Sequence, residues 1–240
     1  MIRSITTEEF ASAARALVGL EISRAWIGYG TAAILELGAL RDETSPEGKT
    51  FQKGEATLMV GWSWRVEGPA AVLFGSTSTR RQVAEGLTTL ESSMLTSISV
   101  DGPLPELTLE LSNGMRVRSF MSADGDPEWL VMLADGSALF VEDRELRQAP
   151  QGEPTEPEIT AEEELVLSHS EQCARRWGTQ VPPSHLFGRC EDCAFFRPME
   201  GEFYFYDFGV CTNPGSAHDA SIVAVDSGCP AYSESLAGQN

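Results

Sequence analysis

The residues best suited to chemistry in this 240-residue chain are five cysteines, all in its last third. Four of them, Cys190, Cys193, Cys211 and Cys229, follow the pattern Cys-x2-Cys-x17-Cys-x17-Cys. A Cys-x2-Cys turn places two sulfur atoms on one side of the backbone, and four thiolates complete the tetrahedral coordination of a zinc ion. The same ligand set holds a four-iron cluster. We therefore expect a metal site, with zinc as the first choice and a 4Fe-4S cluster as the alternative, and leave open that the cysteines bind no metal.

The residues around these cysteines suit a site that is shielded from water. Glycine precedes two of the cysteines, in Gly209-Val210-Cys211 and Gly228-Cys229, where it lets the backbone bend close to a metal. Seven aromatic residues lie between the second and third cysteines: Phe195, Phe196, Phe203, Tyr204, Phe205, Tyr206 and Phe208. Such rings are expected to cover the site.

The order of these features resembles the module of high-potential iron–sulfur proteins. In both, a Cys-x2-Cys knuckle is followed by aromatic residues, a third cysteine and a final Gly-Cys. The resemblance is confined to the C-terminal part of the chain, and it implies that Cys190, Cys193, Cys211 and Cys229 are the ligands. It also implies a function in electron transfer or redox sensing.

Other residues that could do chemistry have plainer interpretations. Cys173 shares a helical face with Leu165, His169 and Trp177 at intervals of four, which predicts a buried packing residue. The alternative is a nucleophilic pair of Cys173 with His169, but no orienting group or oxyanion hole accompanies it. His185 and His218 could each replace one thiolate at the metal, although exposed loop positions are the simpler interpretation.

The charge of the chain limits its partners. The 36 acidic and 17 basic residues give a formal charge of −19, which argues against nucleic acid and against an anionic membrane surface. The N-terminus lacks the apolar stretch of a signal peptide, and no run approaches the roughly 20 apolar residues of a membrane span. We therefore expect a cytoplasmic protein whose partner is a basic protein. The oligomeric state is left open.

A segment rich in proline and glutamate divides the chain. Residues 148–160 contain Pro150, Pro154 and Pro157 and no aliphatic residue larger than alanine before Ile159, so they are expected to form an extended linker. The predicted domains are residues 1–147 and 161–240. The 13 basic and 21 acidic residues before position 151 give −8, whereas the 4 basic and 15 acidic residues after position 150 give −11.

The N-terminal part is expected to be a β-rich α+β domain of antiparallel meanders. Thr6 and Glu9 form a capping box that predicts a short helix. Asn113-Gly114 and Asp135-Gly136 predict hairpins with type I′ turns. Nine short apolar runs bounded by turn residues predict strands at 22–27, 32–37, 56–62, 70–74, 95–100, 107–111, 115–120, 129–133 and 138–141.

Two stretches of this domain resemble each other and indicate an internal repeat of residues 17–75 and 87–141. Leu17-x-x-Leu20-Glu21 recurs as Leu87-x-x-Leu90-Glu91, and Leu35-Glu36-Leu37 recurs as Leu109-Glu110-Leu111. Chance recurrence of these short patterns in amphipathic segments is the alternative. Trp26, Trp62, Trp64 and Trp129 lie on predicted strands, where aromatic residues serve as core or cross-strand partners more often than as a ligand cleft.

The C-terminal part is expected to be a small module with one helix. Thr160 and Glu163 form a second capping box, which opens a helix over 161–176 that ends in Arg175-Arg176. The sequence therefore favours a non-enzymatic, acidic, metal-binding protein that acts in protein–protein interaction, as an inhibitor or immunity-like module. An iron–sulfur protein and an enzyme with a pocket between the two parts are the alternatives.

Overall fold

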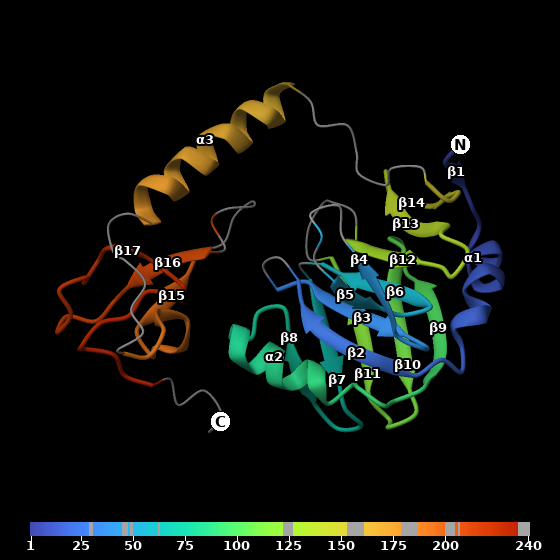
Figure 1. The fold of residues 1–240 in the computed structure, drawn as a ribbon, viewed down its shortest axis with the longest axis horizontal. Coiled ribbons are helices and arrows are strands. Elements are labelled where there is room, and N and C mark those ends of the chain that lie inside the picture. Colours follow the sequence, from blue (N-terminus) through green and yellow to red (C-terminus); the bar gives the residue numbers. More distant parts are fainter. Residues whose placement is uncertain are drawn as a thin grey trace. The chain divides into compact units, whose positions relative to one another are not determined.

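The chain forms two compact units, Met1–Glu156 and Pro157–Asn240 (Figure 1). The computed structural model describes residues 1–28, 31–44, 48, 50–61, 63–121, 127–152, 161–178, 187–199, 205 and 207–234. The division falls within the predicted linker, 148–160, but the linker starts later than predicted. Strand β14 (Glu145–Ala149) includes its first two residues, because Ala149 pairs with Ala138 and is fully buried.

Two antiparallel sheets build the N-terminal unit. The seven-stranded sheet has the order β1-β14-β13-β12-β6-β3-β2, with β1 (Arg3–Ser4), β2 (Ile22–Ile27), β3 (Ala33–Leu37), β6 (Ala56–Val60), β12 (Trp129–Met132) and β13 (Ala138–Glu142). The five-stranded sheet has the order β8-β7-β11-β10-β9, with β7 (Trp64–Glu67), β8 (Val72–Gly75), β9 (Leu95–Asp101), β10 (Glu106–Leu111) and β11 (Arg116–Ser119). With three α-helices among the described residues, the fold belongs to the α+β class, as predicted.

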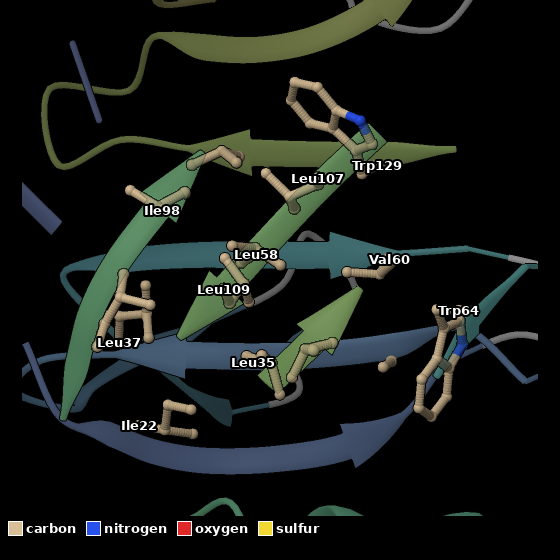
Figure 2. Packing of buried hydrophobic residues seen from close by; sticks show 14 of the residues in the cluster. Ile22, Leu35, Leu37, Leu58, Val60, Trp64, Ile98, Leu107, Leu109 and Trp129 are labelled. Atoms are coloured by element: carbon tan, nitrogen blue, oxygen red, sulfur yellow. The ribbon is translucent and has the colours of Figure 1, made fainter. Parts of the chain in front are cut away.

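The inner faces of the two sheets form one hydrophobic core. Figure 2 shows Leu35 and Leu58 of the seven-stranded sheet close to Leu107 and Leu109 of the five-stranded sheet, and each of these side chains is at most 1% exposed. Alternate residues of the strands point into this core, which is why period-two apolar runs identified the strands. All nine predicted runs are strands, with ends that differ by two residues at most.

The N-terminal unit has two halves of matching topology. The first half gives β2, β3 and β6 to the seven-stranded sheet and then β7 and β8 to the five-stranded sheet. The second half gives β9, β10 and β11 to the five-stranded sheet and then β12, β13 and β14 to the seven-stranded sheet. Glu21 forms a β-bridge with Met94, the residue 73 positions later. The segments 17–75 and 87–141, predicted as repeats, lie in these two halves.

The helices of the two halves also match. Helix α1 (Thr7–Ala14) begins with the predicted capping box of Thr6 and Glu9, and helix α2 (Arg80–Thr88) begins with a capping box of Thr79 and Gln82, 73 residues further along. Helix α1 was predicted from its capping box but α2 was not, although its Thr-x-x-Gln pattern is the same kind of signal. A short 3₁₀ helix, η1 (Arg15–Leu17), follows α1.

Some strands and turns differ from the prediction. Strands β4 (Arg41–Thr44) and β5 (Thr50–Lys53) form a separate hairpin and were missed because nearly all their residues are exposed and lack apolar alternation. The predicted hairpins exist, but their turns are not type I′. Within Asn113-Gly114 and Asp135-Gly136 only the glycine has a positive φ, 80° in both. A single left-handed glycine after a tight turn is the geometry of a hairpin with a bulge.

The C-terminal unit combines one α-helix with a small sheet. Helix α3 (Ala161–Gly178) extends two residues beyond the predicted end and carries Arg175 and Arg176 in its last turn. The predicted cap residue Thr160 lies outside the described residues. Strands β15 (Phe196–Pro198), β16 (Phe208–Cys211) and β17 (Ile222–Ala224) form an antiparallel sheet in that order. No described helix is long and apolar enough to span a membrane.

The buried face of α3 differs from the predicted one. Leu165 and His169 are exposed and Cys173 is only half-buried, so the prediction of a buried face through these residues is wrong. Ser170 is buried instead, and the Trp177 ring packs 5.5 Å from the ring centroids of both Phe205 and Phe208. Trp177 belongs to the predicted face, so the prediction holds at the C-terminal end of the helix and fails at Leu165 and His169.

Candidate metal centre

The Cys-x2-Cys knuckle is a single tight turn. Cys190 opens a 3₁₀ helix, η2 (Cys190–Asp192), and Cys193 follows it, donating its N–H to the Cys190 carbonyl at 2.9 Å. The Cys190 N–H donates to the Ser227 carbonyl at 2.6 Å, two residues before Cys229. A backbone hydrogen bond thus holds the knuckle next to the segment that carries Cys229.

Cys211 enters from the sheet. It is the last residue of β16, lies opposite Phe196 of β15 and is 9% exposed. Its backbone binds the following loop twice: the Cys211 N–H donates to Ser221 at 3.0 Å, and the Ala220 N–H donates to the Cys211 carbonyl at 2.8 Å. Both contacts fix the position of this cysteine at the end of the central strand of the small sheet.

Cys229 lies in a turn near the end of the described chain. The Tyr232 N–H donates to the Cys229 carbonyl at 3.0 Å, and Ser216 Oγ lies 3.5 Å from Cys229 Sγ. The knuckle, the end of a strand and this turn are the three structures that carry the four cysteines.

The four cysteines line one small cavity. Its volume is about 10 Å³, and it is lined by Cys190, Cys193, Cys211 and Cys229 together with Gly188, Phe196, Asn213, Val223, Ala231 and Tyr232. All four thiols are free of disulfides. Within the described parts of the chain, however, no three His, Cys, Asp or Glu side chains are grouped closely enough to form a finished metal-binding set. The structure thus brings the predicted ligands to one cavity without closing them around its centre.

The electrostatics of the cavity disfavour negative charge on the Cys190 thiol. Burial raises the pKa of Cys190 to about 12, and the neighbouring Cys229, Cys193 and Cys211 contribute in the same direction, as does Asp226. In the absence of a cation, several thiolates so close together repel one another. A bound divalent cation reverses this effect, since it stabilises coordinated thiolates.

Aromatic residues cover the cavity in a way that the sequence indicated only in part. Phe196 and Tyr232 line it. A side chain at Gly209 would come within 2.3 Å of the Phe196 ring, and one at Gly188 within 2.3 Å of the Tyr232 ring. Gly209 therefore makes room for a ring, rather than for the metal as predicted. Phe205 and Phe208 pack on α3, and Phe203, Tyr204 and Tyr206 lie outside the described residues.

Of the remaining candidates, the described residues His218 and Cys173 do not line the cavity. His218 is not among its lining residues, and its backbone N–H donates to Ser216 Oγ at 3.0 Å. His185 lies outside the described residues. Cys173 also does not line the cavity, and its Sγ accepts a hydrogen bond from Arg176 at 2.8 Å.

Two of the tryptophans that were predicted on strands, Trp64 and Trp129, are core residues. Trp64 and Trp129 are 1% and 3% exposed, and their indole N–H groups donate to the backbone carbonyls of Thr31 at 2.8 Å and Pro105 at 2.7 Å. Trp26 lies under the Arg24 guanidinium at 4.6 Å. Trp62 lies outside the described residues. Buried tryptophans with satisfied N–H groups are core residues rather than the lining of a cleft.

Comparison with known proteins gives one similarity. Residues 120–236 match the family model described as "Protein of unknown function (DUF3027)". No curated protein and no solved structure matches the chain. The matched segment includes all four cysteines of the cavity, α3 and strands β12 to β14, so it extends across the division between the two units.

Proposed function

We propose that the C-terminal unit is a zinc module in which Cys190, Cys193, Cys211 and Cys229 hold one Zn²⁺ as four thiolates. The observation that carries the proposal is that these cysteines, from separate segments, line one small cavity and form no disulfide. Four thiolates are a complete set for a structural zinc site, which leaves no open position for substrate. The metal therefore serves folding rather than catalysis.

The size of the cavity supports a single ion over a cluster. A space of about 10 Å³ accommodates one small sphere of about the size of a water molecule. A 4Fe-4S cluster brings eight atoms of its own to the four thiolates and needs the cysteines to stand further apart. We therefore favour zinc and keep an iron–sulfur protein for electron transfer or redox sensing as the alternative function.

The protein as a whole fits a non-enzymatic module for protein–protein interaction. Residues 151–240 contain 15 acidic and 4 basic residues, and zinc offsets only two of the four thiolate charges. Such a surface attracts a basic protein and accelerates its association in a salt-dependent manner. We place this protein among inhibitor or immunity-like binding proteins whose acidic face is built on the zinc module.

Metal analysis of the freshly purified full-length protein tests the proposal. We expect one zinc per chain, and its loss in Cys211→Ser, because three thiolates no longer complete the site. Cys173→Ser is the matched control: it removes the fifth thiol, which does not line the cavity, and should retain full zinc content. Circular dichroism then reports whether each variant is folded.

Two results would overturn the assignment. The first is the detection of iron and acid-labile sulfide, with visible absorption, in protein purified without oxygen. It would show that the cysteines hold an iron–sulfur cluster and not zinc. Retention of stoichiometric zinc by Cys211→Ser would show that the ligand set is wrong, whatever the metal.

A further inference from the structure

Residues 212–221, which we name the cysteine loop, leave the small sheet at Cys211 and return to the same residue. The Ala220 N–H donates to the Cys211 carbonyl at 2.8 Å, which closes the base of the loop. Inside the loop, the Ser216 N–H donates to the Asn213 carbonyl at 2.9 Å. These backbone hydrogen bonds hold Ser216 in a defined position near the middle of the loop.

Two side chains of the cysteine loop contact the segment that carries Cys229. Asn213 lines the cavity, and its Nδ2 donates to the carbonyl of Ala231, two residues after Cys229, at 2.8 Å. Ser216 Oγ lies 3.5 Å from Cys229 Sγ, within hydrogen-bond distance for sulfur. The loop therefore contacts this last cysteine twice, through the backbone of its turn and through its sulfur atom.

The hydrogen bonds of Ser216 determine which way its hydroxyl proton points. A hydroxyl group has one proton to donate and two lone pairs that accept. The His218 N–H donates to Ser216 Oγ at 3.0 Å and so occupies one lone pair. Among the described residues, the only other hydrogen-bond partner of this oxygen is Cys229 Sγ. A thiolate has no proton to donate, so with Cys229 ionised the hydroxyl is the donor and the sulfur is the acceptor.

Cys229 depends on such a contact more than the other three cysteines do. Cys190 and Cys193 share one tight turn, and Cys211 ends a paired strand. Cys229 lies outside every described helix and strand. Its sulfur is therefore positioned by the turn around it and by the side chain that hydrogen-bonds to it.

We propose that Ser216 is a positioning residue of the zinc site, which donates a hydrogen bond to the Cys229 thiolate and thereby strengthens zinc binding. This inference rests on the proposed function, because it requires Cys229 to be a zinc ligand. A hydrogen bond to an ionised acceptor is stronger than one between neutral groups, and it disperses charge where zinc offsets only two of four thiolate charges. Removal of a group that hydrogen-bonds to a metal ligand typically lowers metal affinity about 10–100-fold.

Competition for Zn²⁺ between the full-length protein and a chromophoric chelator tests the role of Ser216. We expect Ser216→Ala to bind one zinc at saturation with an affinity at least about tenfold lower. Ser216→Thr keeps the hydroxyl and should restore most of the affinity. The matched control is Ser221→Ala, which removes a hydroxyl of the same loop that donates to the Asp219 carbonyl. It should change the affinity less than about twofold, as ordinary surface substitutions do.

The absorption spectrum of the protein loaded with Co²⁺ separates a hydrogen bond to sulfur from a general effect on folding. A sulfur that loses a hydrogen bond gives up an electron to the metal more easily. The sulfur-to-cobalt charge-transfer band of Ser216→Ala should therefore move to longer wavelength. The bands of Ser216→Thr and Ser221→Ala should stay in place. A packing defect alone would lower the amount of cobalt bound without moving the band.

The outcomes distinguish this inference from the proposed function. Unchanged zinc affinity in Ser216→Ala, equal weakening by Ser216→Ala and Ser221→Ala, or an unmoved cobalt band would reject the role of Ser216 and leave the zinc site in place. Failure of Ser216→Thr to restore the affinity would also count against the hydroxyl. If the unmodified protein bound neither zinc nor cobalt, the proposed function itself would be overturned.

Discussion

The two units are held together by cores of different kinds. Among the described residues, 28 buried side chains of the N-terminal unit form one continuous apolar cluster. In the C-terminal unit, the corresponding cluster consists of Cys211 and Val223, with Cys190 and Phe196 packed against it. One unit is stabilised by burying aliphatic side chains between two sheets, whereas the other has cysteines at its centre.

The two units therefore need different kinds of stabilisation in order to fold. Burial of apolar surface contributes about 25 cal/mol per Å², so a large core supports the N-terminal unit without further help. A core of a few residues does not offset the conformational entropy of some 80 residues, and small modules of this kind depend on metals or disulfides. The five cysteines form no disulfide, so we expect the proposed zinc ion to provide this stabilisation.

Removal of the proposed zinc ion should therefore change the protein most. A strong chelator added to the full-length protein should unfold the C-terminal unit and leave the N-terminal unit intact, because zinc contributes about 10–16 kcal/mol of apparent folding free energy in such modules. Limited proteolysis followed by mass spectrometry checks this. Cleavage should appear within 187–234, while Met1–Glu156 survives as a fragment.

Cys173→Ser serves as the control for chelation and should respond as the unmodified protein does. Continued protection of residues 187–234 in the presence of chelator would contradict the comparison, since it would show that the C-terminal unit folds on its small apolar core alone.

The next effect in size is damage to the apolar core. Leu58→Ala removes a fully buried side chain that pairs with Leu35 on one neighbouring strand and Val131 on the other. Such truncations cost about 2–5 kcal/mol of unfolding free energy. Urea denaturation followed by tryptophan fluorescence measures the loss, and zinc content should not change.

Val72→Ala provides the comparison variant, because Val72 is 59% exposed and its truncation is expected to cost less than about 0.5 kcal/mol. Loss of zinc from Leu58→Ala would show that the two units are coupled in stability and that their cores cannot be treated as independent.

Local patterns account for the parts of the fold that the sequence predicted. Apolar alternation identified strands such as β2 (Ile22–Ile27), because one face of each is buried. The capping box of Thr6 and Glu9 identified α1 in the same way. The exchange of strand pairs between halves, as in the pairing of β6 with β12, was not predictable because no local pattern specifies which distant strand becomes a neighbour.

At the candidate site too, local sequence patterns predicted some features and missed those that depend on distant contacts. The spacing of the four cysteines predicted that they would meet, and they line one cavity. The sequence did not indicate Tyr232 or Gly188, because the contact of the ring with the glycine joins residues distant in sequence and depends on the folded loop. The face of α3 was mispredicted because spacing by four was followed through Leu165, which is exposed.

The helix caps of the two halves of the N-terminal unit should each contribute little to its stability. Thr6→Ala and Thr79→Ala each remove one capping box, at the start of α1 and α2. Each should cost about 1 kcal/mol of unfolding free energy, and the double variant should lose the sum, because the two caps share no hydrogen-bond partner. Urea denaturation of the three variants measures this. Equal losses would show that halves of matching topology also match in stability, whereas a much larger loss from one cap would show that this half limits the unfolding of the unit.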